Sequence, residues 1–243
     1  RFSIPLFPVG TEYWVPLVLR LSVVAVVYTS LTARRQTDRK RVIAYASVAH
    51  LNRTLVGLFA RRQAGLEGSL LQRLSHGVVS GALFRCVGVL YDRHHSRRIH
   101  YYGGRVHTRP VFVGRFRLFT RANIALPGTS SFVGEFLILV GIYESNTLVT
   151  VLSATGLILG GGYSLWLFNR VSYGNLKRSY VGPSPDRTRR EVVAFRPLVI
   201  LTLLRGVYPQ PYLDTRHVSC VELLEHSRYR KECGQAYLGR GEV

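Results

Sequence analysis

Methionine is absent from this chain of 243 residues, and lysine and cysteine occur only three times each. Cys86, Cys220 and Cys233 follow no metal-ligand spacing, and their odd number gives no disulfide framework. The sequence also lacks a glycine-rich phosphate loop, a flavin motif and an iron–sulfur cysteine set. We therefore predict that this chain binds no redox cofactor and no metal.

Acidic residues are scarce as well. Thirteen aspartates and glutamates face 33 basic residues, which gives a formal net charge of +20. Such a charge is typical of proteins that bind nucleic acid. The arginines, however, are scattered, do not alternate with aromatic side chains as a base-stacking platform requires, and often interrupt apolar runs. A soluble basic nucleic-acid-binding protein is therefore the alternative that composition suggests and the pattern argues against.

What the chain does contain is a series of apolar runs, most of them about 20 residues long, the length of a helix that crosses a bilayer. The run 147–170 is uncharged until Arg170 and ends in Tyr163 and Trp166, residue types that favour the membrane interface. These runs predict transmembrane helices. The candidate spans are 13–33, 38–60, 68–92, 108–126, 130–143, 147–170 and 191–208.

One of these runs contains a carboxylate. Glu135 lies within 130–143, just after Pro127 and Gly128, which predict a break between two helices. A broken helix and an acid inside a membrane both cost free energy, so together they suggest a path for protons or ions. The alternative is a carboxylate near a helix start, where the helix dipole favours an anion. The residues alone leave both interpretations open.

Two histidines, His50 and His76, lie in other predicted spans. A single histidine in a helix is more often a hydrogen-bonded core residue than part of a proton relay. With Glu135, however, they place three titratable groups on separate helices, and such groups within a membrane usually face the bundle interior or a hydrated path. An imidazole and a buried carboxylate can both exchange protons near neutral pH.

Taken together, these features predict an all-α fold. We expect a polytopic transmembrane helix bundle over 1–209, with a broken helix near Pro127-Gly128. Residues 210–243 are polar and lack hydrophobic periodicity, so we expect an extramembrane C-terminal tail there.

Over most of residues 1–217 the chain resembles the antiporter-like membrane subunit four of respiratory NADH:ubiquinone oxidoreductase (complex I). Several long motifs occur in the same order, which is more specific than any single short pattern. They are RQTDRKRVIAYASVAHLN at 35–52, LSHGVVSGALF at 74–84, VLYDRHHSR at 89–97, YYGG at 101–104, ANIALPGTSSFVGEFLILVG at 122–141 and YSLWLFNRVSYGNL at 163–176.

The resemblance implies the second half of an inverted-repeat antiporter-like fold, with the first half upstream of Arg1. It also implies that His50, His76 and Glu135 belong to the proton channel of this second half, with Glu135 near the exit. Lys40 matches a lysine of the family's TD-x-K motif. The alternative for Lys40 is an interfacial residue whose long side chain extends to the membrane surface.

By the same resemblance, the protein would be a proton-translocating subunit that couples quinone reduction elsewhere in the complex to proton transfer. NADH, FMN, iron–sulfur clusters and ubiquinone would be bound by other subunits. The partners would be other membrane subunits of complex I and the lipid bilayer, without nucleic acid or a small-molecule ligand. The expected location is the mitochondrial inner membrane, with a bacterial plasma membrane as the alternative. A subunit of a related cation/proton antiporter is the alternative function.

The resemblance also shows which of the many arginines are unusual for the family. Fifteen arginines stand where the family typically has an apolar residue, and arginine at the centre of a span costs about 2.5–3.5 kcal/mol on insertion scales. Removing fifteen charges from +20 leaves +5. We hypothesise that a codon printed as arginine is read as leucine or methionine, or that the transcript is edited; a degenerate copy is the alternative. The fifteen are Arg20, Arg34, Arg39, Arg53, Arg73, Arg85, Arg105, Arg109, Arg115, Arg117, Arg121, Arg187, Arg196, Arg205 and Arg216.

Overall fold

The computed structural model describes residues 3–175 and 188–238, and the regular structure of these residues is helical. This confirms the predicted all-α class. The helices are α1 (Ser3–Leu6), α2 (Pro8–Arg35), α3 (Arg39–Phe59), α4 (Gln63–His94), η1 (Ile99–Tyr101), α5 (Arg105–Thr108), α6 (Pro110–Asn123), α7 (Ser130–Tyr143), α8 (Thr147–Ser172), α9 (Arg189–Val207) and α10 (Gln210–Leu238).

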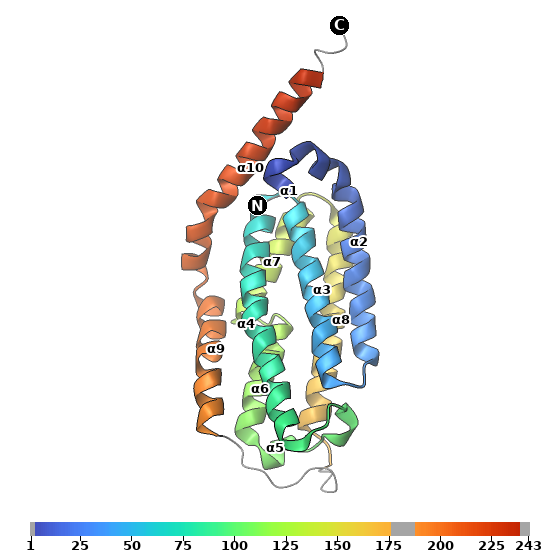
Figure 1. Cartoon of the computed structure of the whole chain (residues 1–243), viewed down its shortest axis with the longest axis vertical. Helices are drawn as coiled ribbons and strands as arrows, with labels where there is room; N and C mark the ends of the chain where they lie inside the picture. The colour runs from blue at the N-terminus through green and yellow to red at the C-terminus, as the bar shows by residue number, and fades with distance from the viewer. Residues whose placement is uncertain (1–2, 176–187, 239–243) are drawn as a thin grey trace.

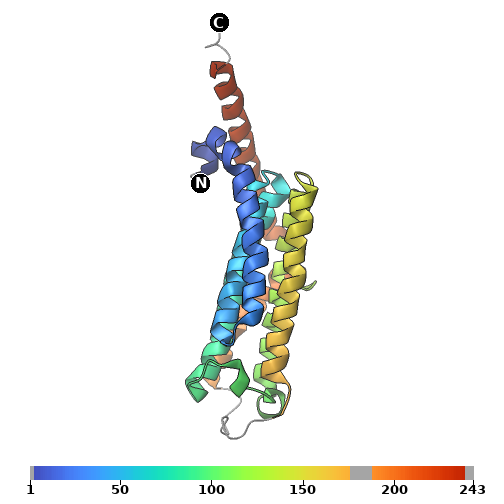
Figure 2. The ribbon, with the colours of Figure 1, turned by 90° about the vertical axis from the view of Figure 1, so that its right-hand side faces the viewer.

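Four helices, α2, α3, α4 and α8, are long and apolar enough to cross a membrane. They run along the long axis of the molecule (Figures 1 and 2). Large apolar side chains such as Tyr28, Leu148 and Ile158 are exposed on α2 and α8, as expected for helices that face lipid. The predicted polytopic helix bundle is therefore confirmed.

The helix break at Pro127-Gly128 is also confirmed, and it changes the predicted spans around it. Helices α6 and α7 have 14 residues each, or about 21 Å, which is too short to cross a hydrocarbon layer about 30 Å thick. They follow one another along the bundle axis (Figure 1). Gly128 between them has φ +86°, a conformation that side chains disfavour. The two runs 108–126 and 130–143 are thus two half-helices and not two full-length spans.

Helices α4 and α7 approach each other closely along a contact lined by glycine. A Cβ atom added at Gly68 would lie 2.8 Å from the backbone nitrogen of Ile138, and one added at Gly141 would overlap the backbone of Gly65. A Cβ added at Gly134 would lie 2.9 Å from the backbone nitrogen of Gln72. Small residues at such positions let membrane helices pack backbone to backbone. This contact holds the middle of α7 directly against α4.

The predicted tail contains a long helix that the sequence pattern did not predict. Helix α10 (Gln210–Leu238) bends away from α9 by 69° and contacts α1, α2 and α4. It then projects beyond the end of the bundle (Figure 1). The Nδ1 atom of His217 on α10 lies 2.9 Å from Oε1 of Glu67 on α4. The segment is polar, so no apolar stripe identified it as a helix; its extramembrane placement stays a prediction.

Candidate functional site

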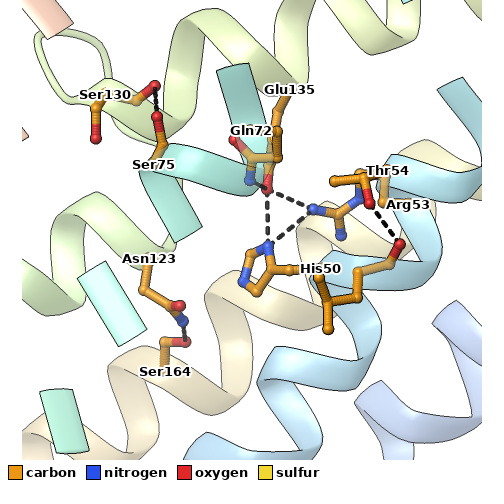
Figure 3. A network of polar contacts seen from close by, with 10 residues as sticks. His50, Arg53, Thr54, Gln72, Ser75, Asn123, Ser130, Glu135 and Ser164 are labelled. Atoms are coloured by element: carbon orange, nitrogen blue, oxygen red, sulfur yellow. Dashed lines mark hydrogen bonds and ion pairs between the residues drawn. The ribbon is translucent and has the colours of Figure 1, made fainter. Parts of the chain in front are cut away.

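Three helices bring the predicted residues together in the bundle interior. His50 lies on α3, His76 on α4 and Glu135 on α7, and all three are buried. Glu135 is the sixth residue of α7, beyond the first turn in which a helix dipole acts most strongly on an anion. Its side chain points towards α3 and α4 (Figure 3). The contacts of Glu135 therefore come from neighbouring helices and not from its own helix start.

One carboxylate oxygen of Glu135 is the centre of the site. Its Oε1 atom lies 2.9 Å from Nδ1 of His50 and accepts a hydrogen bond of 3.0 Å from Nε2 of Gln72. The same oxygen accepts a hydrogen bond of 2.6 Å from Nη1 of Arg53, and the two side chains form a buried ion pair. Figure 3 shows His50, Arg53 and Gln72 around Oε1. The other oxygen, Oε2, has no hydrogen-bond partner among the residues that the structure describes.

His76 extends the site along α4. Its ring centroid lies 5.2 Å from that of His50, with the two rings tilted by 32°. The Nε2 atom of His50 is buried and has no hydrogen-bond partner within the described part of the chain. The two imidazoles and the carboxylate thus form a continuous cluster of groups that can hold or release a proton.

Buried polar pairs flank this cluster in the bundle interior. The hydroxyl of Ser75 donates to the backbone carbonyl of Ser130 at 3.0 Å, and the amide of Asn123 donates to the hydroxyl of Ser164 at 3.1 Å. Figure 3 shows these pairs on helices around the His50–Glu135 contact. Buried polar groups in lipid-facing bundles are costly unless they pair or line a polar path. The interior is therefore polar on more than one side of the central carboxylate.

Lys40 does not join the cluster. Its side chain is exposed at the start of α3, ten residues before His50, which corresponds to about 15 Å along a helix. The buried residue at this end is its neighbour Arg39, whose guanidinium lies 3.6 Å from the ring centroid of Tyr102 and donates to the carbonyl of Ser96. The helical period places Arg39, not Lys40, on the face that also carries His50 and Arg53.

Two residues of the site, Arg53 and Gln72, are not in the predicted set. In the sequence, Arg53 is one of fifteen arginines that stand where the resembling family typically has an apolar residue. Gln72 precedes His76 by four residues, so both lie on one face of α4. That spacing was the available signal for Gln72. No sequence signal paired Arg53 with Glu135, because their contact depends on how α3 packs against α7.

Buried arginine is a general property of this bundle. Arg39, Arg53, Arg105 and Arg109 are the bulkiest of its fully buried side chains. The three guanidinium nitrogens of Arg105 have no hydrogen-bond partner in the described residues. Burial, together with the nearby charge of Arg109, lowers the pKa of Arg105 to about 10. Arg53 differs from Arg39 and Arg105 because it forms a buried ion pair with a carboxylate.

The described residues contain no group of three histidine, cysteine or acidic side chains arranged to hold a metal ion. Cys86 and Cys220 are both buried and free. His50, His76 and Glu135 are side chains of types that can accept and release protons.

Comparisons with known proteins group the chain with respiratory membrane subunits. The family model described as NADH:quinone oxidoreductase/Mrp antiporter, transmembrane, matches residues 1–160. The chain is 52% identical over 229 residues to NADH-ubiquinone oxidoreductase chain 4 of Marchantia polymorpha, which covers 94% of this chain and 46% of that relative. It is 50% identical over 226 residues to NADH-quinone oxidoreductase subunit M of Rhodobacter capsulatus, with coverage of 93% and 44%.

The fold agrees with these sequence relationships. A chain of respiratory complex I from Thermus thermophilus with bound NADH is similar to 93% of this chain, with a TM-score of 0.85 and 29% identity, over 48% of its own length. The chain thus spans about half the length of the relatives that it matches. The family model covers about two thirds of the sequence, and the predicted resemblance is confirmed: the chain belongs to the NADH:quinone oxidoreductase/Mrp antiporter transmembrane family.

Proposed function

We propose that the chain is a proton-translocating membrane subunit of a respiratory NADH:quinone oxidoreductase. The observation that carries this proposal is the buried contact of 2.9 Å between His50 and Glu135, with His76 beside it, inside a bundle of membrane-spanning helices. Titratable groups are rare at such depth and usually mark a path for protons or ions.

The geometry supports a short relay. A proton held on the Glu135 carboxyl can pass to the facing nitrogen of His50, and His50 can release a proton from its opposite ring nitrogen. Nε2 of His50 and Oε2 of Glu135 are the two atoms of the pair that make no hydrogen bond to described residues. They are the atoms through which protons would enter and leave the pair.

The rest of the proposal extends the resemblance to complex I. NADH oxidation and quinone reduction take place on other subunits, which bind NADH, FMN, iron–sulfur clusters and ubiquinone, while this chain carries no redox step. Its partners are other membrane subunits of that complex and the lipid bilayer. Its location is the mitochondrial inner membrane, because relatives named chain 4 come from organisms such as Marchantia polymorpha and Arabidopsis thaliana.

Replacing the central carboxylate tests the proposal. Glu135→Gln keeps the size of the side chain and its ability to accept a hydrogen bond, but it removes the titratable proton. In vesicles that contain the whole complex, we expect fewer protons pumped per NADH oxidised, with the complex still assembled. The matched control is Glu144→Gln, which changes the exposed carboxylate that follows α7. Unchanged pumping in Glu135→Gln, made in a complex that pumps protons before the substitution, would contradict the proposal.

A further inference from the structure

Arg53 occupies the position that most directly affects the Glu135 carboxylate. Its Nη1 atom lies 2.6 Å from Oε1, closer than the nearest atom of His50 or Gln72. The two side chains of this ion pair are only 2% and 3% exposed. Charge-assisted hydrogen bonds of this length are among the strong ones in proteins. The contact is therefore a tight, water-excluded ion pair at the centre of the candidate relay.

Arg53 has no comparable alternative partner. Its Nε atom makes no hydrogen bond to described residues, and Nη1 also lies 3.4 Å from Nδ1 of His50, which is itself bound to Glu135. Its Nη2 atom lies beside Gly156 on α8, where an added Cβ atom would be 3.4 Å from Nη2 and would overlap a methyl group of Val26 on α2. Val26 is a fully buried apolar residue. The guanidinium therefore depends on Glu135 for its countercharge.

This dependence links the charge of Glu135 to that of Arg53. Protonation of the carboxylate would remove the countercharge and leave a buried guanidinium without an ionic partner, which is strongly unfavourable. A carboxylate that cannot be protonated cannot pass a proton to His50. An uncharged residue at position 53 would leave the contacts of Glu135 with His50 and Gln72 in place.

We infer that residue 53 controls whether Glu135 can exchange a proton. Arginine at position 53 keeps Glu135 ionised, and we call this the closed form of the site. An uncharged side chain lets Glu135 take up and release a proton, and we call this the open form. The inference rests on the proposed function. It assigns residue 53 a positioning role, in which it acts on protons only through Glu135. Val26 of α2, which lies beside the same glycine of α8 as the guanidinium, is apolar and buried, so an apolar side chain at position 53 also fits the bundle. The working protein would then carry such a residue at position 53.

The first measurement is the identity of residue 53 in the native protein. Trypsin cleaves after arginine, so a tryptic peptide that runs uncut through position 53, with the mass of leucine or methionine there, identifies an uncharged residue. Sequencing the transcript then separates editing from a reassigned codon. We expect an uncharged residue in any complex that pumps protons at full stoichiometry.

The second measurement compares both forms in the whole complex. Position 53 is made arginine in one strain and leucine in another, and protons pumped per NADH oxidised are measured in vesicles. We expect a loss of pumping with arginine and none with leucine. NADH oxidation by an artificial electron acceptor checks assembly. The matched control makes the same change at exposed Arg73 on α4, where we expect equal pumping from both forms.

A spectroscopic readout distinguishes closing of the site from simple misfolding. Infrared difference spectra of the leucine form should show the carbonyl band of a protonated carboxylic acid, which Glu135→Gln removes. The arginine form should lack this band. If the leucine form does not assemble, Arg53→Gln supplies a neutral side chain of similar length, for which we expect the same band and the same pumping.

The outcomes separate the inference from the proposed function. Full pumping with arginine confirmed at position 53, lost in Glu135→Gln, would overturn the inference and leave the function standing. Full pumping in the leucine form despite Glu135→Gln would overturn the proposed function itself. Loss of pumping with arginine, together with loss of the Glu135 band, would support both.

Discussion

Helix α3 carries buried arginines in two regions, and the partners of the guanidinium differ between them. At its middle, Arg53 pairs with Glu135, and the carboxylate also contacts His50 and Gln72. At its start, Arg39 lies over the ring of Tyr102, which also faces the guanidinium of Arg105 at 5.1 Å. No carboxylate forms an ion pair with Arg39 or Arg105 in the described residues.

The difference shows what a buried cation requires. An aromatic face returns about 2 kcal/mol when it is desolvated, whereas taking a charge out of water costs several kcal/mol. A buried guanidinium that is paired with a carboxylate has its countercharge, so removing the carboxylate lowers stability. A buried guanidinium without such a partner itself lowers stability, so an apolar residue in its place would raise it. The same residue type is therefore expected to have opposite effects in the two regions.

The largest expected effect lies in the paired region. Glu135→Ala with arginine at position 53 leaves a buried cation uncompensated and should lower stability by about 3–5 kcal/mol. With leucine at position 53, the cost should fall well below that range. The midpoint of thermal inactivation of the purified complex, measured for both backgrounds, gives the coupling between the two positions.

The control for this cycle is Glu144→Ala at the exposed end of α7, which should change stability by about 0.5 kcal/mol or less. Equal costs of Glu135→Ala in the two backgrounds would contradict the ion pair and remove the contrast between the two regions.

The unpaired region should respond in the opposite direction. Arg105→Leu replaces a buried guanidinium, all of whose nitrogens lack hydrogen bonds to described residues, and should raise stability by about 1–4 kcal/mol. The same thermal measurement applies. Arg41→Leu, at a side chain that is 70% exposed, is the matched substitution and should have little effect. A loss of stability in Arg105→Leu would mean that this cation has a stabilising partner.

The smallest expected effect concerns Lys40, which lies beside Arg39 at the start of α3 but faces outward. Lys40→Ala removes an exposed charge and should change stability by about 0.5 kcal/mol or less. Pumping per NADH oxidised should be unchanged, in contrast to Glu135→Gln. A clear loss of pumping would place Lys40 in the proton path and extend the functional region to the start of α3.

The sequence predicted the elements whose signal is local. The uncharged run 147–170 corresponds closely to α8 (Thr147–Ser172), and Pro127-Gly128 marks the break between α6 and α7. Helix α10 was not predicted, because a polar helix lacks the apolar period on which such a prediction depends. In the structure it contacts α1, α2 and α4.

The residues of the candidate site also divide into those that a local sequence signal predicts and those that depend on helix packing. His50, His76 and Glu135 were identified because titratable residues stand out within apolar runs, and the structure brings them together. The pairing of Glu135 with Arg53 and Gln72 was not predictable, because it depends on the rotation and separation of three helices. The resemblance suggested a channel role for Lys40, but helical phase places its side chain outside the cluster.

The glycine contact between α4 and α7 bears on how natural variation in this chain is interpreted. Gly65, Gly68, Gly134 and Gly141 contribute no proton-carrying group, yet the closeness of the two backbones at these glycines determines where Glu135 stands relative to Gln72. An added methyl group would wedge the helices apart and separate a carboxylate from its donors without altering either. Inherited changes at four chemically inert positions can therefore disable this site as effectively as the loss of Glu135 itself.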